Sequence, residues 1–355
     1  MTITIRPRRT VLAAVLTLPL VIGLSACGGD TEADTAASDG TSTSGDGAAA
    51  QEEVTLKLAH SYTEEQPQHR CGAAVIAEEV AASDVGLTID IFPSSQLGGD
   101  ADRISAVVAG DIDMDIQGAS ALGAVYEPIG ILDAAYAFED GPSLSAFVAG
   151  DASEGMRTAF ADASGVNVLG AWSAGARQFT ANTPIRTPED LDGLRMRFPN
   201  SPQFLMNAKA LGASATEVAY EELYLALQQG TVDGQENPIV NIDAINLDEV
   251  QEDISLSNHQ LNSNLVIVGP VWDKLSDEQQ SALQGAVDAA VEKVPACVEE
   301  SEQKILQEWK ESGAMEVIED VDVESFRTKA RAYFEENLKG ETLDLYTAIM
   351  DSSTR

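Results

Sequence analysis

The first part of the chain alternates between short strands and amphipathic helices. Apolar side chains at every second position predict strands at residues 54–60, 87–92 and 111–116, and apolar side chains at helical spacing predict helices at 66–83 and 101–109. This β-α-β-α-β order is typical of a parallel sheet with helices on its faces. The pattern therefore predicts an α/β fold.

The rest of the chain continues this mixture of elements. The same patterns predict strands at 166–169, 194–198, 265–268 and 315–318, and helices at 143–163, 221–229 and 323–338. A long helix is expected to begin after Ser276, a typical N-cap residue, and to run towards Gly313. Pro295 lies inside this helix and should kink or break it. The last residues carry no clear pattern.

The N-terminal segment has the features of an export signal. Three arginines within the first nine residues precede an apolar run at 11–24, and Leu-Ser-Ala-Cys at 24–27 is similar to a lipobox. The apolar run is short for a membrane span, and neither an anchor helix nor an ordinary secretory signal explains Cys27. We expect residues 1–27 to be a lipoprotein signal peptide lipidated at Cys27, and residues 28–51 to be a flexible tether. The protein would then be extracytoplasmic and anchored to the cell membrane by lipid alone.

Length and charge narrow the classes of partner. The chain has 355 residues, enough for two domains, and its formal net charge is −37. Such an acidic surface repels nucleic acids and anionic lipids, so nucleic acid is not expected as a partner. An anionic ligand remains compatible, because arginines in a cleft outweigh distant charges that salt screens beyond about 10 Å. The charge itself is best explained by solubility.

Three side chains between residues 177 and 238 are able to bind a carboxylate. Arg197 lies at the end of the predicted strand at 194–198, where Pro199 stops the alternation, and Arg177 follows the strand at 166–169. Each guanidinium offers a planar fork of donors that matches the two oxygens of a carboxylate. Asn237 precedes a proline, which holds it extended, and its amide donates without adding negative charge.

The same region resembles a known family. The run Asp-Leu-Asp-Gly-Leu-Arg-Met-Arg-Phe-Pro-Asn at 190–200 and the long run ending in Asp-Gly-Gln-Glu-Asn-Pro at 224–238 are similar to DctP-type solute-binding proteins of TRAP transporters. Ile-Phe-Pro-Ser-Ser-Gln-Leu-Gly-Gly at 91–99 resembles the family's first-domain signature, and the likeness extends from about Val54 to about Leu338. One departure is at 135–136, where the family often has proline and phenylalanine, which affects one pocket wall.

The resemblance implies a two-lobed, periplasmic-binding-protein-like α/β fold. Each lobe would be a mainly parallel sheet flanked by helices, with the long late helix spanning both lobes. We place lobe I at about 52–174 and 263–300, and lobe II at about 175–262 and 301–340. The crossing between them is expected near 172–175, where small residues permit a hinge.

The resemblance also implies a function and a site. The family's proteins close around a small organic acid and deliver it to the membrane subunits of a TRAP transporter, without a cofactor. Arg197 would form the main salt bridge to the ligand carboxylate, and Arg177 and Asn237 would complete the clamp. We add Trp172, which could line the cleft or belong to the core, and His60, which could hydrogen-bond a ligand from a strand end.

The cysteines leave two possibilities open. The chain has three cysteines, and the lipobox accounts for Cys27. Cys71 in the first helix and Cys297 in the long helix form an even pair, which in an exported protein suggests a disulfide. Two buried thiols remain the alternative, because spacing alone does not establish the required Cα separation.

Other kinds of function find less support in the sequence. The motifs Gly-x-Ser-x-Gly, His-Glu-x-x-His, the P-loop and Gly-x-Gly-x-x-Gly are absent, so we do not expect an enzyme. Asp233 and Glu236 are the nearest candidate acid/base pair for the alternative of a carbohydrate-active or other exported enzyme. A binding protein that serves a sensor or an ABC transporter is a further alternative.

Three segments of the first part have features of a ligand site. The aspartates at 111, 113 and 115 lack the glycine and glutamate of an EF-hand, so no metal is expected and they are interpreted as the polar side of a strand. Residues 118–123 form a small-residue turn at a strand end, which makes them a candidate for the cleft wall. Gly-Gly-Asp at 98–100 is interpreted as a turn and N-cap, with a ligand site as the alternative.

Overall fold

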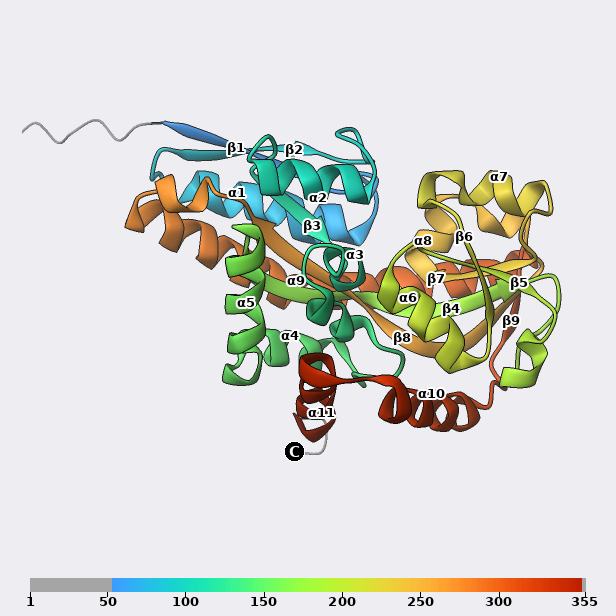
Figure 1. The fold of residues 1–355 in the computed structure, drawn as a ribbon. Coiled ribbons are helices and arrows are strands. Elements are labelled where there is room, and N and C mark those ends of the chain that lie inside the picture. Colours follow the sequence, from blue (N-terminus) through green and yellow to red (C-terminus); the bar gives the residue numbers. More distant parts are fainter. Residues whose placement is uncertain (1–52, 353–355) are drawn as a thin grey trace, which may run out of the picture. The chain divides into compact units, whose positions relative to one another are not determined.

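A computed structural model describes residues 53–352 of the chain, and these residues form one compact unit (Figure 1). The predicted signal peptide at 1–27, its lipidation site Cys27 and the predicted tether at 28–51 lie outside the described residues. Between residues 53 and 352, none of the helices combines the length and the apolar character needed to cross a bilayer. In the same range, no group of three or more histidine, cysteine or acidic side chains is arranged to hold a metal ion.

A single mixed sheet runs through the described part. Its strand order is β2-β1-β3-β8-β4-β7-β5-β6, and β9 pairs with β8. The strands are β1 (Val54–Ala59), β2 (Leu87–Phe92), β3 (Met114–Gln117), β4 (Asn167–Ala181), β5 (Arg195–Phe198), β6 (Ser214–Glu217), β7 (Gly234–Pro238), β8 (Asp253–Val268) and β9 (Glu316–Ile318). Strands β1, β2 and β3 pair in parallel at one end of the sheet, and β5, β6 and β7 pair in parallel at the other. The predicted α/β class with mainly parallel halves is confirmed.

Two long antiparallel strands join the two parallel halves. Strand β4 has 15 residues and β8 has 16, and they pair along most of their length. The strand expected at 166–169 is therefore only the start of β4, and the segments 254–259 and 265–268 belong to one strand. Register shifts interrupt the ladder between Ser173 and Ala176, where Gly175 has φ +102°, a backbone conformation that favours glycine.

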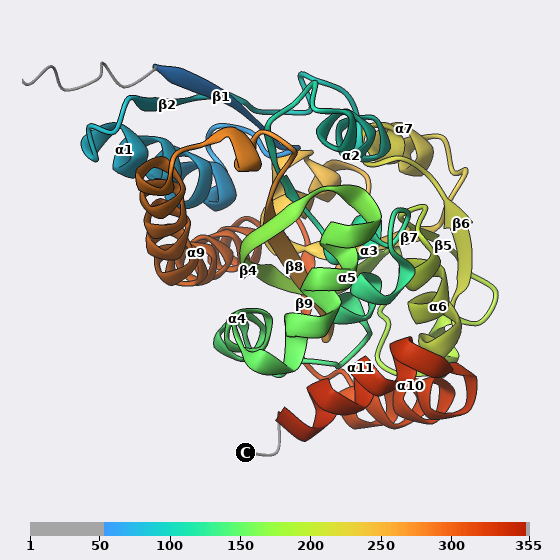
Figure 2. The same cartoon turned by 60° about the vertical axis from the view of Figure 1, so that its left-hand side comes forward.

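Helices cover both faces of the sheet. They are α1 (Ala74–Ala82), α2 (Asp100–Ala109), α3 (Ala119–Leu122), α4 (Gly141–Ala149), α5 (Glu154–Ser164), α6 (Pro202–Leu211), α7 (Leu223–Gln228), α8 (Ile239–Ala244), α9 (Asp277–Ser312), α10 (Val323–Asn337) and α11 (Gly340–Ser352). Helices α10 and α11 lie on the side away from β1 and β2 (Figure 2). Short π- or 3-10 turns include η1 (Gln68–Ala73), η2 (Glu127–Asp133), η3 (Asp151–Ser153) and η5 (Tyr220–Glu222).

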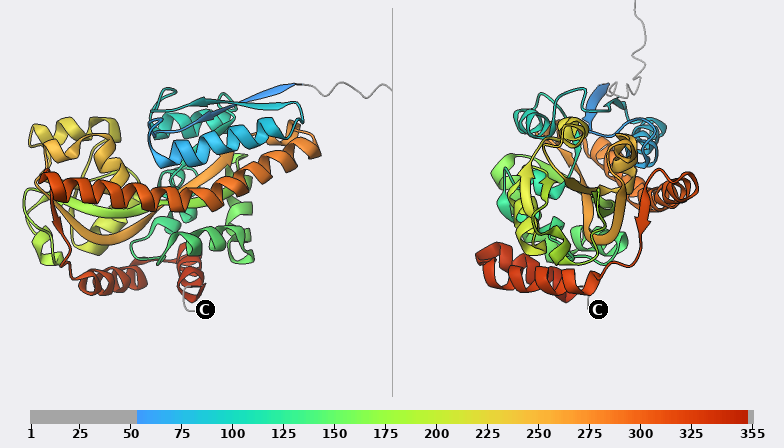
Figure 3. Two further views of the ribbon diagram at one scale, coloured as in Figure 1. Left: turned by 180° about the vertical axis from the view of Figure 1, so that it is seen from behind. Right: turned by 90° about the vertical axis from the view of Figure 1, so that its right-hand side faces the viewer.

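The 36-residue helix α9 spans the described part, as predicted (Figure 3, left). Its N-terminus has a capping box, in which Ser276 accepts from the Gln279 amide and the Gln279 side chain accepts from the Ser276 amide. Of the two expected effects of Pro295, a kink or a break, the break does not occur, because α9 continues through the proline. Burial of one face, including Val294 and Val298, offsets the lost hydrogen bond of the proline.

Two further expectations about helices are corrected. The single helix expected at 143–163 is two helices, because Gly150 adopts an extended conformation and ends α4 before η3 and α5 begin. No pattern in the sequence predicted α11, whose Leu345, Tyr346 and Ile349 are buried against the rest of the protein. Tertiary packing rather than local pattern therefore stabilises this last helix.

The strand expected at 111–116 begins later, at Met114, and its aspartates do not share one polar face. Asp115 is fully buried and forms an ion pair with Arg103 at 3.2 Å, whereas Asp113 accepts a hydrogen bond from the Lys57 amide. Alternation alone could not detect the buried cation that makes an inward aspartate possible.

Candidate functional site

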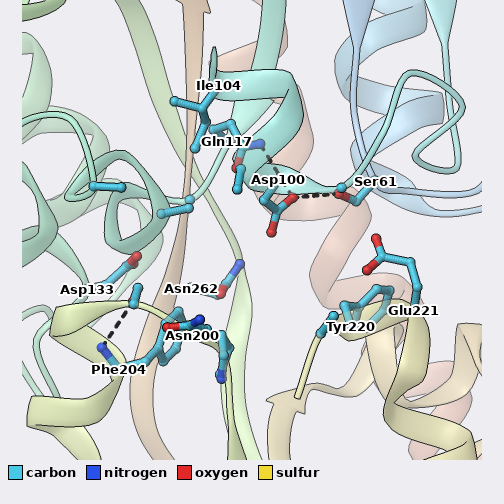
Figure 4. Close-up of a pocket in the computed structure, with 18 of the residues that line it drawn as sticks. Ser61, Asp100, Ile104, Gln117, Asp133, Asn200, Phe204, Tyr220, Glu221 and Asn262 are labelled. Atoms are coloured by element: carbon cyan, nitrogen blue, oxygen red, sulfur yellow. Dashed lines mark hydrogen bonds between the residues drawn. The ribbon is translucent and has the colours of Figure 1, made fainter. Parts of the chain in front are cut away.

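A cavity of about 590 Å³ lies between the two parallel halves of the sheet (Figure 4). A volume of this size suits a small organic molecule. Its walls come from the loop after β1, the first turn of α2, the end of β3, the start of α6, the segment before α7, and strands β4, β7 and β8. The polar side chains that line it include Ser61, Tyr62, Asp100, Gln117, Asp133, Arg177, Arg197, Asn200, Tyr220, Glu221, Asn237, Asn241, Asn262 and Asn264.

Arg177 on β4 is a buried cation with an internal counter-ion. Its guanidinium forms an ion pair with Glu236 on β7, and Nη2 also donates to Glu236 Oε1 at 2.8 Å and to the backbone oxygen of Glu236 at 2.7 Å. Nη1 donates to Asn262 Oδ1 at 2.7 Å, and the guanidinium lies 4.7 Å from the centre of the Phe204 ring. The side chain of Arg177 is therefore held in one position before any ligand arrives.

Glu236 is ionised behind the cavity wall. Burial raises its pKa, but the charge of Arg177 and hydrogen bonds from His259 and Arg177 outweigh burial and lower the pKa below its usual value. His259 lies on β8 with Nε2 3.3 Å from Glu236 Oε2, and its ring stacks on Phe179 at 4.2 Å. Burial lowers the pKa of His259, so the imidazole is neutral at pH 7. Arg177 and Glu236 thus neutralise each other.

Arg197 on β5 is also buried, but no carboxylate balances it. Its relative exposure is 2%, and none of the acidic groups between residues 53 and 352 lies within salt-bridge distance of it. Nε donates to the backbone oxygen of Val218 at 2.8 Å, while Nη1 is buried without a hydrogen-bond partner. Burial lowers the pKa of Arg197 to about 10; the charge of Glu236 opposes this fall and that of Arg177 adds to it, and Arg197 stays charged at neutral pH. An unpaired buried cation of this kind is a site for an anion.

Amide side chains surround the two arginines. Asn237 Oδ1 accepts from Arg177 Nη2 at 3.1 Å, and Asn237 Nδ2 donates to Gln235 Oε1 at 2.5 Å. The three predicted clamp residues, Arg177, Arg197 and Asn237, therefore lie in one cavity. Strand pairing explains this convergence, since β7 lies between β4 and β5 in the sheet.

The cavity wall next to β1 and β3 carries an acidic side chain that hydrogen bonds hold in place. Asp100, the first residue of α2, accepts at Oδ1 from Ser61 Oγ at 3.0 Å, from Arg103 Nη2 at 2.9 Å and from Gln117 Nε2 at 3.4 Å. The N-cap position itself is taken by Gly99, so the turn expected at 98–100 is present with Asp100 just inside the helix. Figure 4 shows the Asp100 carboxylate pointing into the cavity.

Trp172 and His60 are not among the residues that line the cavity. Both are fully buried, Trp172 in the core beside Asn264, to whose Oδ1 it donates at 3.2 Å. His60 accepts at Nδ1 from the Tyr62 amide at 3.2 Å, and its Nε2 lies 3.1 Å from His69 Nδ1. Each therefore contacts a cavity residue from behind.

Several cavity residues were missed in the sequence. They include Tyr62, Asp133, Asn200, Phe204, Tyr220, Asn241, Asn262 and Asn264. The Asn-Ser-Asn run at 262–264, directly before the apolar run at 265–268, was a usable signal, whereas Phe204 on α6 has none. The small-residue turn at 118–123 contributes Gly118 and Ala121 to the wall. The departure at 135–136 does not affect the cavity, because neither residue lines it.

The two remaining cysteines lie close together in the described part. Cys71 in η1 and Cys297 in α9 are joined by a disulfide, with their Cα atoms 6.5 Å apart. The bond connects the first helical segment to the spanning helix, outside the cavity wall.

Comparison with known proteins identifies the family. The family of bacterial extracellular solute-binding proteins, family 7 (DctP), matches residues 58–340. The chain belongs to this family. This TRAP solute-binding protein is 33% identical over 247 residues to a solute-binding protein of Roseobacter denitrificans. The alignment covers 69% of this chain and 75% of the relative. The sialic acid-binding periplasmic protein of Vibrio cholerae is 30% identical over 260 residues, with coverage of 73% and 80%.

Solved structures show that the TRAP solute-binding protein has the predicted two-lobed fold. A TRAP periplasmic solute-binding protein from Roseobacter denitrificans with bound L-galactonate superposes with a TM-score of 0.77 at 30% identity, covering 84% of this chain and 99% of the other. One from Sulfurospirillum deleyianum with bound succinate gives a TM-score of 0.76 at 26% identity, with coverage of 84% and 99%. Members of this family are extracytoplasmic receptors rather than enzymes.

Proposed function

We propose that this receptor captures a small organic acid through a salt bridge between a ligand carboxylate and Arg197, and delivers it to TRAP membrane subunits. The observation that supports this most directly is the buried, charged guanidinium of Arg197, whose Nη1 has no partner in the cavity. A carboxylate placed there supplies both the missing charge and the missing acceptor. The relatives with bound L-galactonate and succinate hold organic acids.

Arg177 and Asn237 complete the clamp in this proposal. Arg177 is oriented by Glu236 and Asn262, so it presents a fixed donor edge at no further entropic cost. Asn237 shares a hydrogen bond with Arg177 and adds a neutral amide donor beside it. Trp172 and His60 act through Asn264 and Tyr62, whose side chains line the cavity.

We further propose that the protein binds its ligand without turnover. Asp233 and Glu236, the candidate acid/base pair of an enzyme, are both held in ion pairs. Asp233 pairs with Arg195 at 2.5 Å, and Glu236 pairs with Arg177. Neither acid lines the cavity. An acid already committed to a buried or bidentate arginine is poorly placed to shuttle protons to a substrate.

Closure and anchoring belong to the same proposal. Lobe I, at about 52–174 and 263–300, and lobe II, at about 175–262 and 301–340, would close about β4 and β8. The register shift near Gly175 supports this location. Lipidation at Cys27 would hold the receptor at the membrane. A Cys27→Ala variant is expected to leave the membrane fraction and lose the acyl mass.

The test of carboxylate capture is a calorimetric titration of the purified protein against a panel of organic acids after removal of co-purified ligand by unfolding and refolding. Arg197→Ala should weaken binding by about 2 to 5 kcal/mol, and Arg197→Lys should also weaken it, because the fork geometry is lost. Arg195→Ala is the matched control, since Arg195 is on the same strand but its side chain is half exposed and outside the cavity.

Three outcomes separate the alternatives. Tight binding of one acid that is lost in the Arg197 variants and retained in Arg195→Ala supports the proposal. Binding that survives Arg197→Ala would overturn the assignment of the site. Chemical conversion of the bound acid, followed by nuclear magnetic resonance over hours, would favour an enzyme instead.

A further inference from the structure

The cavity contains more acidic than basic side chains, although the proposed ligand is an anion. The acidic side chains that line it are Asp100, Asp102, Asp133, Glu217, Glu221 and Glu222, and the basic ones are Arg177 and Arg197. Glu236 already neutralises Arg177 from behind the wall. One cation, Arg197, is therefore left to balance ligand charge, which is enough for a single carboxylate.

The opposite wall offers acceptors rather than donors. Asp100 Oδ1 is engaged by Ser61, Arg103 and Gln117, but no partner is found for Asp100 Oδ2 among residues 53–352. The Asp100 side chain is 52% exposed and faces the cavity (Figure 4). Glu221 lies across from it on the other half of the sheet and accepts from Ser95 Oγ at 3.0 Å.

The Asp100 carboxylate is held in place by a buried network. Arg103 is fully buried and binds both Asp100 at 2.9 Å and Asp115 at 3.2 Å. The Gln117 side chain donates to the same two aspartates, at 3.4 Å and 3.0 Å. An acceptor fixed in this way is suited to select a ligand group, because little ordering remains to be done on binding.

We propose that the receptor is selective for monocarboxylates whose far end carries hydrogen-bond donors, either hydroxyl or ammonium groups, and that Asp100 Oδ2 accepts from those donors. This proposal rests on the proposed function, since it requires the carboxylate at Arg197. A dicarboxylate would place its second negative charge against Asp100 and Glu221, where nothing neutralises it. A polyhydroxy acid or an amino acid instead donates to this acceptor and replaces the water that the bound ligand displaces from it.

The test compares ligands that differ only at the far end. Galactonate and galactarate share five carbons and differ in a terminal hydroxymethyl against a terminal carboxylate, and erythronate and meso-tartrate make the same comparison in four carbons. The 6-amino-6-deoxy analogue of galactonate carries an ammonium group at that end. Calorimetric titration of the full chain should show the hydroxyl or ammonium member binding about tenfold or more tightly than the dicarboxylate.

Asp100→Asn is the decisive variant, because it keeps an acceptor oxygen for Arg103 and removes the charge. The preference for the donor-bearing ligand should collapse by about tenfold or more, and the dicarboxylate should gain affinity. Glu221→Gln tests the acid that faces Asp100. It should change the ratio of the two ligand affinities less than Asp100→Asn does. Asp90→Asn removes the same charge from an exposed residue of β2 outside the cavity and should change nothing.

The outcomes distinguish this inference from the proposed function. Equal or tighter binding of the dicarboxylates, lost in Arg197→Ala, would overturn the selectivity while leaving carboxylate capture intact. An unchanged ratio in a well-folded Asp100→Asn, with a changed ratio in Glu221→Gln, would move the acceptor to Glu221 and overturn the role of Asp100. If no acid of any kind binds, the proposed function fails and the selectivity fails with it.

Discussion

Two arginines in one cavity have opposite surroundings, and this contrast defines the site. Arg177 is 3% exposed and paired with Glu236, whereas Arg197 is 2% exposed and unpaired. Burying a charge without a partner is unfavourable, so the fold carries the unpaired guanidinium at a cost that a ligand carboxylate can offset. Arg197, whose charge and Nη1 lack a partner among residues 53–352, is thus suited to bind an anion from outside.

The Arg177–Glu236 pair is expected to stabilise the fold. Glu236→Gln leaves a buried guanidinium without its counter-ion, which should lower the free energy of unfolding by about 3 to 5 kcal/mol. Urea denaturation followed by circular dichroism measures this change. Asp233→Asn is the control, because it breaks the largely exposed pair with Arg195 and should cost about 0 to 1 kcal/mol. Equal losses in the two variants would contradict the special role of the buried pair.

At the level of secondary structure, helix α9 connects regions that the sheet alone does not. Cys297 joins it to η1, Glu302 packs at the β4 bulge beside Gly175, and Trp309 lies in the apolar cluster around α7 and α8. A Cβ atom at Gly175 would displace the flexible end of the Glu302 side chain, and the φ of +102° favours glycine at this position. The helix thereby contacts the strand where the two halves of the sheet meet.

The disulfide is expected to stabilise the protein without taking part in binding. A Cys71→Ser, Cys297→Ser double variant should lose about 2 to 4 kcal/mol of unfolding free energy, because a long loop in the unfolded chain is no longer closed. Ligand affinity should stay the same, since neither cysteine lines the cavity. Thiol titration of the unfolded, unreduced protein is the direct check. Two reactive thiols from these positions would refute the bond.

Glu302 should make stability depend on pH. Burial raises its pKa from 4.5 to about 8, the nearby charge of Glu299 adds to the rise, and the Ile239 backbone amide opposes it. A raised pKa means that the folded state holds the proton more tightly, so the stabilisation is complete below about pH 4.5 and is lost as the pH rises through about 8.

Glu302→Gln should remove that dependence. Between pH 6 and pH 9 the melting temperature of the native protein should fall more steeply than that of the variant, measured by differential scanning calorimetry. The comparison is made between the two proteins because Asp115, whose pKa burial raises to about 7, contributes in the same direction to both. Parallel curves would show that Glu302 does not hold a proton in the folded state.

For the whole molecule, the dominant feature is its negative charge. The formal net charge of −37 is carried by 58 acidic and 21 basic residues, so acids far outnumber the cations that could pair with them. Mutual repulsion of these charges opposes the compact state, and salt screens it. The single unpaired cation in the cavity works within this field because salt screens exposed surface charges more than about 10 Å away.

Salt is therefore expected to stabilise the protein. The melting temperature should rise as sodium chloride increases from about 10 mM to about 150 mM, because the screening length falls from about 30 Å to about 8 Å. Choline chloride at equal ionic strength should give the same rise, which separates screening from specific ion binding. A flat or falling melting temperature would show that surface repulsion is not a significant term.

Much of the fold was accessible from local patterns. Alternation located β1, β2 and β5 to within a residue or two, and the capping signature at Ser276 placed the start of α9 correctly. The failures have physical causes: α11 is held only by tertiary contacts, and Asp115 faces inward because Arg103, twelve residues earlier, is buried beside it. Neither contact leaves a periodic signal in the chain.

The candidate site, like the fold, was predictable from the sequence only in part. Residue chemistry and motif were sufficient to single out Arg177, Arg197 and Asn237, because a guanidinium and an amide have the same donors wherever they lie. Strand order, a long-range property, brought the three together and excluded Trp172 and His60 from the wall. Only the packed structure showed that Glu236 forms an ion pair with Arg177 and not with Arg197, because ion pairs depend on proximity in space rather than along the chain.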